Sequence, residues 1–345
     1  MALPPKTLSR RPARLTNRSG TRPRPRPRAP KAPTLRLRRV LVPTDFSPAA
    51  NAVLPAAVQW CEGFRAELHL VHVCEVDFYA PSLMVAPRVV PRSKIKKEAR
   101  SHLQELAREQ GSRLHHVRIH VSEGRPHQEI CRLARELDAD LIMTATRGRT
   151  GLKHLTLGST AERVIRHAPC PVLALHPPLG PARLRAPVLR KILVPIDFSA
   201  AAAQGLAYAR ALAAQFRARL ILLHSVDLHY YSTNPDYVLL DLPPLLAAAE
   251  KAGDEQMREL VDQTDWQGLK VEPTVERGHV GAQVCRRARE MGADLIVTST
   301  HGRTGLKRVL LGSTAEYIVR HASCPVLVVP SHLQSARTTR QGGRE

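Results

Sequence analysis

The chain has 345 residues, which is enough for about two domains of average size. Hydrophobic residues make up 43% of it, which excludes a wholly disordered chain, and aromatic residues only 4%, so aliphatic side chains must form the cores. The formal net charge is +22, but residues 1–39 hold 13 Lys and Arg and no Asp or Glu, which leaves +9 for the remainder. The basic excess is therefore concentrated in an N-terminal segment.

The lengths of the apolar runs and the spacing of the cysteines indicate in which compartment the protein is located. No apolar run approaches the roughly 18–20 residues that a membrane span needs, and no apolar stretch follows the basic start, so we expect neither a span nor a secretory signal. The six cysteines lie far apart with no C-x-x-C pair, which favours free thiols in a reducing compartment over disulfides or a metal site. These features predict a cytoplasmic protein.

The N-terminal segment is unsuited to a folded core. Residues 1–38 contain eight prolines and the run TRPRPRPR, in which like charges repel and proline removes backbone donors. We expect residues 1–37 to form a disordered Arg/Pro-rich tail, extended and solvated. A second interpretation stays open, in which the tail is an electrostatic arm for nucleic acid or another polyanion. No aromatic residues are interleaved for base stacking, which weakens any sequence-specific role.

After the tail, the sequence repeats itself. The stretch VLVPTDFS at 40–47 returns as ILVPIDFS at 192–199, and 147–161 returns as 301–315 with 11 of 15 positions identical. HAPCPVL at 167–173 likewise returns as HASCPVL at 321–327. The order and spacing agree throughout, so we expect two copies of one unit, at 38–176 and 190–330. They are joined by a Pro-rich linker at 177–189 and followed by a disordered C-terminal tail at 331–345.

Each copy alternates short β-branched runs with helical patterns, which predicts an α/β fold with a parallel sheet flanked by helices. The expected strands lie near 38–43, 67–74, 115–121, 140–145 and 171–176, and near 191–196, 219–225, 269–275, 294–299 and 325–329. The expected helices lie near 48–63, 93–110, 127–137 and 160–167, and near 200–216, 244–263, 280–291 and 314–321. The fold class is therefore two tandem five-stranded parallel sheets.

Unusual residues gather where the expected strands end, which is where open parallel sheets bind their ligands. The first strand of each copy ends in an aspartate, Asp45 and Asp197, just before a helix. Ser47 and Pro48 suit the N-cap and first turn of that helix. Each aspartate can either stabilise the helix amides or accept a hydrogen bond from a ligand hydroxyl or amine. The recurrence in both copies favours the ligand.

The fourth strand of each copy runs into a glycine-containing loop. The first copy has Gly148 and Gly158, and the second has Gly302 and Gly312. Glycine lets the backbone approach an anion closely, and the helix that follows presents free N–H groups. The stretches at 159–162 and 313–316 read S-T-A-E, which fits capping boxes. Arg and Lys side chains in both loops add positive charge, so each loop is predicted to cradle phosphate.

Other nucleotide and catalytic motifs are missing from the sequence. The loop lacks the G-x-x-x-x-G-K-[ST] pattern of a P-loop, and no G-x-G-x-x-G follows the first strand. No catalytic base or magnesium carboxylate stands out, so we expect little or no enzymatic turnover; weak ATP hydrolysis stays an alternative without dedicated residues. His72 and His224 lie in apolar strands and are interpreted as satisfied core histidines.

Four motifs follow one another in the chain: V-P-x-D-F-S, L-x-H-V, G-R-T-G-L…L-G-S-T-A-E and H-A-x-C-P-V-L. In this combination the sequence resembles the universal stress protein family, specifically its tandem two-domain members. The resemblance covers residues 38–176 and 190–330. It implies a Rossmann-like, adenine nucleotide alpha-hydrolase-like fold and ATP binding, with Mg²⁺ as an accompanying ion. Family members often pair through the last strand, so it also implies a homodimer or an internal pseudo-dimer of the two halves.

The resemblance also implies roles for individual residues. Asp45 and Asp197 would contact the adenosine portion, and the backbone at Val73 and Ser225 would contact adenine. The first glycine of the family's phosphate motif falls on Ala145 and Ser299, where this chain departs from the pattern. The full set of candidate binding residues is Pro43, Thr44, Asp45, Val73, Thr144, Ala145, Arg147, Gly148, Arg149, Gly158, Ser159, Thr160, Pro195, Ile196, Asp197, Ser225, Thr298, Ser299, His301, Gly302, Arg303, Gly312, Ser313 and Thr314.

Two functions of different classes remain open at this point. The first is a cytoplasmic stress-response protein with tandem ATP-binding domains and little or no catalytic turnover. The second is a non-nucleotide interaction platform, formed by the twin domains, whose basic arm binds nucleic acid or another polyanion. The two functions do not exclude each other.

Overall fold

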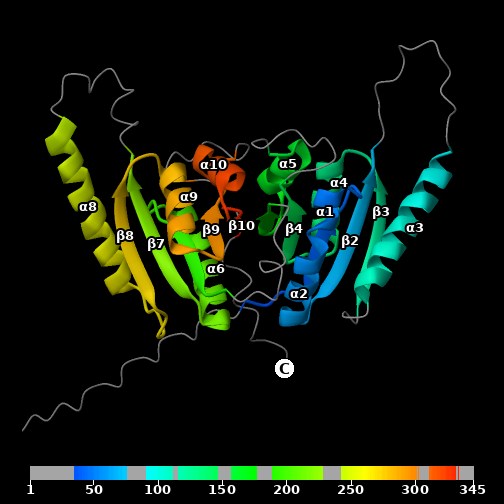
Figure 1. Cartoon of the computed structure of the whole chain (residues 1–345), viewed down its shortest axis with the longest axis horizontal. Coiled ribbons are helices and arrows are strands. Elements are labelled where there is room, and N and C mark those ends of the chain that lie inside the picture. Colours follow the sequence, from blue (N-terminus) through cyan, green and yellow to red (C-terminus); the bar gives the residue numbers. More distant parts are fainter. Residues whose placement is uncertain are drawn as a thin grey trace, which may run out of the picture. The chain divides into compact units, whose positions relative to one another are not determined.

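The computed structural model describes residues 35–75, 91–111, 116–146, 157–176, 189–227, 242–300, 302, 311–331 and 333. These residues form a ten-stranded sheet with the strand order β3-β2-β1-β4-β5-β10-β9-β6-β7-β8 (Figure 1). The tails expected at 1–37 and 331–345 fall almost wholly outside the described residues. No helix within the described part is long and apolar enough to cross a membrane.

Every strand and helix expected from the sequence overlaps an element of that type. The first half contains β1 (Arg39–Pro43), α1 (Pro48–Asn51), α2 (Leu54–Phe64), β2 (Glu67–Cys74), α3 (Arg92–Gly111), β3 (Val117–Glu123), α4 (Pro126–Glu136), β4 (Leu141–Ala145), α5 (Ser159–His167) and β5 (Val172–Leu175). The second contains β6 (Lys191–Pro195), α6 (Ala200–Phe216), β7 (Arg219–Val226), α8 (Leu242–Gln263), β8 (Val271–Arg277), α9 (Val280–Met291), β9 (Leu295–Ser299), α10 (Ser313–His321) and β10 (Val326–Val329). The prediction of two tandem parallel α/β units is confirmed.

One expected helix is divided in the structure. The helix predicted near 48–63 is two helices, α1 and α2, which are separated at residues 52–53. Pro55 lies in the first turn of α2 and has no N–H to donate back to Asn51, so the helical ladder is interrupted there. The second half has Ala207 at the matching position, and its helix α6 runs unbroken through it.

The sheet alternates its side chains between two apolar layers. Val40 and Val42 of β1 belong to one buried cluster, which includes side chains of α2, α3, α6 and α8. Leu41 points to the opposite face and joins the cluster with α4, α5, α9 and α10. Strands that are covered on both faces are therefore apolar at nearly every position, as the sequence pattern predicted.

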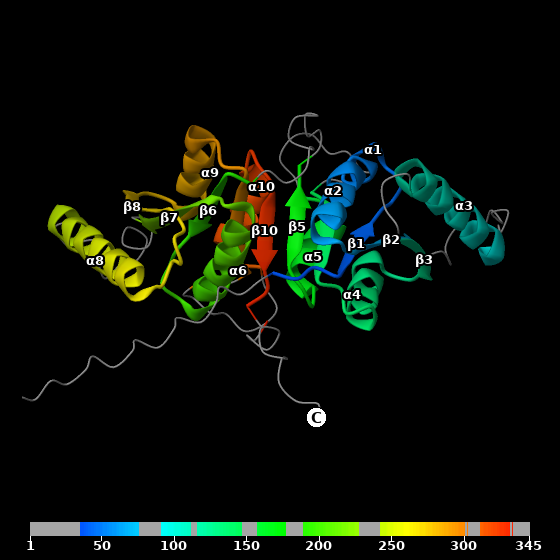
Figure 2. The ribbon, with the colours of Figure 1, turned by 90° about the horizontal axis from the view of Figure 1, so that it is seen from below.

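The two halves meet at their last strands. β5 and β10 pair in antiparallel register, with Val172 opposite Val328 and Ala174 opposite Val326 (Figure 2). All other pairs of neighbouring strands in the described sheet are parallel. The rings of Phe64 and Phe216 also meet edge to face across the halves, with 5.8 Å between their centroids. The halves therefore pair within one chain, in the manner that the resemblance implies for a pseudo-dimer.

Candidate functional site

The turn after the first strand is organised by its own polar side chains. In the first half, the Asp45 carboxylate accepts the backbone N–H of Ser47 at 3.0 Å, and the Ser47 hydroxyl caps α1 by accepting the N–H of Ala50. In the second half, Asp197 accepts from Ser199 at the same distance, and Ser199 caps α6. The predicted N-cap at Ser47 is confirmed. Each aspartate uses one oxygen, Oδ1, in this bond, and its position at the strand end is fixed by it.

An aromatic residue in each turn has an unusual backbone conformation. Phe46 and Phe198 adopt the left-handed region, with φ of 64° and 62°. A bulky residue rarely takes this conformation, and backbone strain of this kind is concentrated at functional sites. Nothing in the local sequence indicates it, so sequence reasoning missed both residues. The repeated strain shows that the turn is held by its surroundings.

Those surroundings include the strand histidines. The Phe46 ring stacks on His72 with 4.3 Å between centroids, and Phe198 lies against His224 at 4.7 Å. The Nδ1 atom of His72 is 2.9 Å from the carbonyl oxygen of Thr44, and that of His224 is 2.8 Å from the carbonyl of Ile196. Both histidines therefore hold the turn in place, which confirms their interpretation as satisfied structural residues.

In each half, a threonine just before the glycine loop is hydrogen-bonded to the glycine at the end of that loop. Thr146 follows β4, and its carbonyl oxygen accepts the N–H of Gly158 at 2.8 Å. Thr300 follows β9 and accepts from Gly312 at 2.9 Å. The candidate residues Arg147, Gly148, Arg149, His301 and Arg303, within these loops, lie outside the described residues.

The helix that ends each loop begins differently from the prediction. Gly158 and Gly312 are the N-caps of α5 and α10, with no side-chain hydrogen bond to the first turn. The expected capping boxes at 159–162 and 313–316 are therefore wrong. Extended φ and ψ angles at each glycine move the cap one residue earlier, so Ser159 and Ser313 are already helical. Since no side chain caps the described first turn, its backbone N–H groups remain suited to an anion.

Both sites sit where the strand order reverses. β1 lies between β2 and β4 in the sheet, and β6 lies between β7 and β9, so the candidate residues at their carboxyl ends share one edge in each half. In the second half this includes a direct contact. A Cβ added to Gly302 would lie only 2.6 Å from Oδ2 of Asp197. The structure thus joins the strand-end aspartate to the beginning of the glycine loop.

The remaining candidates lie around these edges. Val73 and Ser225 come near the ends of β2 and β7, and Ser225 donates its hydroxyl to the carbonyl of Gly278 at 2.7 Å. Ala145, which replaces a family glycine, is buried in the apolar cluster with α2. Its methyl group therefore belongs to the core. Ser299 is half-buried. Gly205 of α6 lies close to it, because a Cβ on Gly205 would be 3.7 Å from the backbone nitrogen of Ser299.

The fold and this edge define a doubly wound α/β protein with two equivalent carboxyl edges in one chain. The model of the universal stress protein family matches residues 36–176 and 189–330. The chain therefore belongs to the universal stress protein family, as a member with two tandem domains.

Individual relatives agree with this assignment. Universal stress protein MJ0531 of Methanocaldococcus jannaschii is 32% identical over 144 residues, which cover 41% of this chain and 83% of that protein. Universal stress protein Rv2005c of Mycobacterium tuberculosis is 28% identical over 194 residues, covering 55% of this chain and 62% of that protein. A universal stress protein structure from Archaeoglobus fulgidus matches 85% of this chain and 98% of its own, with a TM-score of 0.63 and 20% identity. That structural similarity concerns the fold.

Proposed function

We propose that each half of this universal stress protein binds one ATP molecule at its carboxyl edge, with little or no turnover. Asp45 and Asp197 would accept hydrogen bonds from the adenosine portion, and the backbone at Val73 and Ser225 would contact adenine. The first turns of α5 and α10 would receive the phosphates. Mg²⁺ would arrive with the nucleotide, because no group of three or more metal-ligating side chains is present among the described residues.

One observation carries this proposal. Gly302 lies very close to the Asp197 carboxylate. A side chain at residue 302 would displace this carboxylate, because its Cβ would be 2.6 Å from Oδ2 of Asp197. Glycine at this point lets the loop backbone run directly beside the group expected to contact the adenosine portion. A ligand that contacts Asp197 can then reach the uncapped helix that begins after Gly312, where the dipole favours phosphate.

A structural role for the site histidines supports a binding function. The Nδ1 atoms of His72 and His224 are engaged with backbone carbonyls, so this nitrogen of each ring serves to hold the turn after the first strand. We therefore expect the protein to act as a nucleotide-dependent stress module. Weak hydrolysis would have to use residues outside this set.

The test begins with the protein purified without added nucleotide. Mass spectrometry of the released small molecules is expected to find an adenine nucleotide, and titration calorimetry is expected to show saturable ATP binding. Replacing Gly158 and Gly312 together by valine should abolish binding while the far-ultraviolet circular dichroism stays unchanged. Unchanged affinity in this folded double variant would refute the placement of the phosphates.

The concentration of basic residues in the tail supports a second function. Residues 1–39 carry 13 of the 52 Lys and Arg residues and no acidic ones. As a further role we propose that residues 1–37 bind nucleic acid or another polyanion by counterion release, so that affinity falls steeply with salt. Deleting residues 1–37 should abolish this binding and leave ATP binding unchanged. A truncated chain that binds DNA and RNA as before would refute it.

The domain limits and the location form part of the same proposal. We place the two nucleotide-binding domains at 38–176 and 190–330, with a linker at 177–189. The six cysteines are buried and none forms a disulfide, which is typical of a protein kept in a reducing compartment. Burial raises the pKa of the Cys61 thiol to about 12. A cytoplasmic location follows and can be tested by cell fractionation.

A further inference from the structure

A hollow on the second half lies away from the proposed ATP edge. It has a volume of about 440 Å³ and opens between α9 and the later part of α10. Its described lining includes Arg286, Arg289, Arg320 and His321, together with Tyr317, and contains no carboxylate. We propose that this hollow is a binding site for a phosphate monoester.

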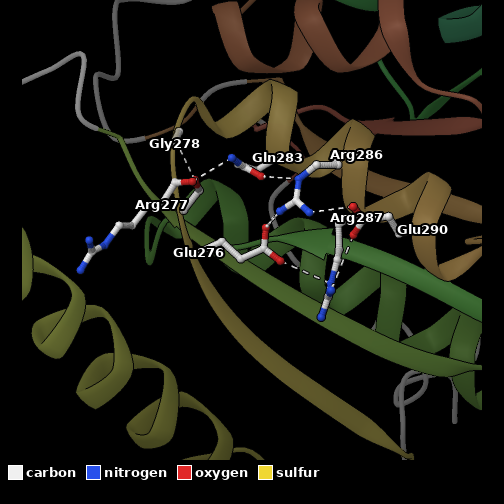
Figure 3. A network of polar contacts seen from close by, with 8 residues as sticks. Glu276, Arg277, Gly278, Gln283, Arg286, Arg287 and Glu290 are labelled. Atoms are coloured by element: carbon white, nitrogen blue, oxygen red, sulfur yellow. Dashed lines mark hydrogen bonds and ion pairs between the residues drawn. The ribbon is translucent and has the colours of Figure 1, made fainter.

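The first arginine is held in place before any ligand arrives. Arg286 donates from Nε to Gln283 at 2.8 Å, and from its two terminal nitrogens to Glu290 and Glu276 at 2.7 Å each (Figure 3). Gln283 is fixed in turn, because its amide donates to the backbone carbonyl of Arg277 at 2.8 Å. These three bonds leave two N–H groups of the guanidinium for an anion, and they remove the entropy that a mobile arginine would lose on binding.

The second arginine carries an unsatisfied donor. Arg320 forms an ion pair with Glu316 through one terminal nitrogen at 2.5 Å, but its buried Nε has no hydrogen-bond partner in the described structure. Buried donors without an acceptor are rare in native proteins and point to a missing ligand or water. Arg166, at the equivalent place in the first half, has the same orphaned Nε.

The third arginine supplies charge that is not neutralised. Arg289 is exposed, and no described carboxylate lies within ion-pairing distance of it. The floor of the hollow is rigid, because the Tyr317 ring stacks on His321 with 4.1 Å between centroids. The ring also packs against Gly281, where a Cβ would come within 2.6 Å of it. The three arginines therefore line a hollow whose aromatic side chain is packed in place.

Phosphate fits this arrangement by both shape and charge. Guanidinium groups bind phosphate through pairs of parallel N–H···O bonds, and Arg is preferred over Lys for this geometry. A monoester is a dianion with three terminal oxygens, which three arginines around one hollow can share. A nucleic acid backbone offers single charges in a row, which would require a track of arginines along the surface.

The experiment titrates the full-length protein with inorganic phosphate and with phenyl phosphate, and follows the histidine ring resonances by NMR. The His321 signal is assigned by comparison with His321→Gln. Saturable shifts of this signal are expected with both ligands. Arg289→Glu should weaken them at least tenfold, whereas Arg258→Glu, which reverses another exposed arginine, on α8, should leave them unchanged. Because both arginines are exposed, both variants are expected to fold, and thermal melts check this.

Three results would overturn the proposal. The first is a His321 signal that does not respond, and the second is an Arg289→Glu variant that responds like the wild type. The third is loss of the response in Gly312→Val, since phosphate would then act from the ATP edge. If an oligonucleotide without terminal phosphates binds more tightly than phenyl phosphate, the hollow is part of a nucleic acid surface and not a monoester site. Failure of ATP binding alone leaves all these readouts unaffected, so the two proposals fail separately.

Discussion

Gly302 lies directly against the carboxylate of Asp197, so that a Cβ at residue 302 would come 2.6 Å from Oδ2. The contact joins the end of β6 to the loop after β9. Gly302→Ala is therefore expected to push Asp197 out of place and to weaken ATP binding in the second half about tenfold, or ~1.4 kcal/mol. Titration calorimetry of the variant against the wild type measures the effect.

A matched glycine provides the control for this substitution. Gly63 of α2 has no atom within 4 Å of where a Cβ would lie. Gly63→Ala should leave ATP binding unchanged and raise the free energy of unfolding by roughly 0.5–1 kcal/mol, because alanine favours the helix. Equal ATP affinities of Gly302→Ala and Gly63→Ala would contradict the proposed role of Asp197.

The two loop threonines offer a paired test of hydrogen bonding. Thr146 Oγ1 is buried without a partner in the described structure, whereas Thr300 Oγ1 accepts the N–H of Ser331 at 3.1 Å. In the sequence, the residue matching Ser331 in the first half is Pro177, which has no N–H. Thr300→Val should lower the free energy of unfolding by about 1 kcal/mol, and Thr146→Val should leave it unchanged or raise it. Urea unfolding measures the free energy of unfolding of both variants. Equal losses in the two variants would contradict the difference in hydrogen bonding between Thr146 and Thr300.

Ser225 tests whether adenine is contacted through the backbone. Its hydroxyl donates to the carbonyl of Gly278 at 2.7 Å. Ser225→Ala should therefore lower the free energy of unfolding by about 1 kcal/mol without changing ATP affinity. The measurements are urea unfolding and calorimetry on the same preparation. A large loss of affinity with unchanged stability would show that the hydroxyl itself holds the ligand.

A histidine pair in the first half predicts a dependence on pH. His69 and His120 lie 3.0 Å apart between Nδ1 and Nε2, with Glu67 and Arg118 close by. Burial lowers the pKa of both rings, and the neighbouring His120 lowers that of His69 further. Below the unfolded value of about 6.5, the unfolded chain binds more protons than the folded one. The free energy of unfolding should therefore fall as the pH drops from about 7 towards 5.

The substitution that tests this pair is taken from the second half. Thr274 occupies the position that matches His120, so His120→Thr should make the dependence of stability on pH shallower between about pH 5 and 7. His116→Gln, at an exposed position just before β3, is the control and should keep the wild-type slope. Identical slopes for all three proteins would show that the His69–His120 pair does not control the acid sensitivity.

Some features were predictable because they depend on local pattern. The apolar strand runs and the repeat with its constant spacing sufficed for the ten strands, and parallel strands necessarily bring Asp197 and the glycine loop to one edge. The proline at residue 55 also indicates, from the sequence alone, the break between α1 and α2. The left-handed Phe46 has no such indication, because packing against His72 imposes that conformation. The pairing of His69 with His120 likewise depends on the register of β2 against β3, which no local pattern shows.

The central claim is that the carboxyl edges of the two halves bind ATP through the glycine loops. Titration calorimetry of the full-length protein with ATP, beside the folded Gly158→Val and Gly312→Val double variant, tests it most directly. We expect saturable heat for the wild type and none for the variant. Absence of binding to the wild-type protein, or equal binding to both proteins, would contradict it.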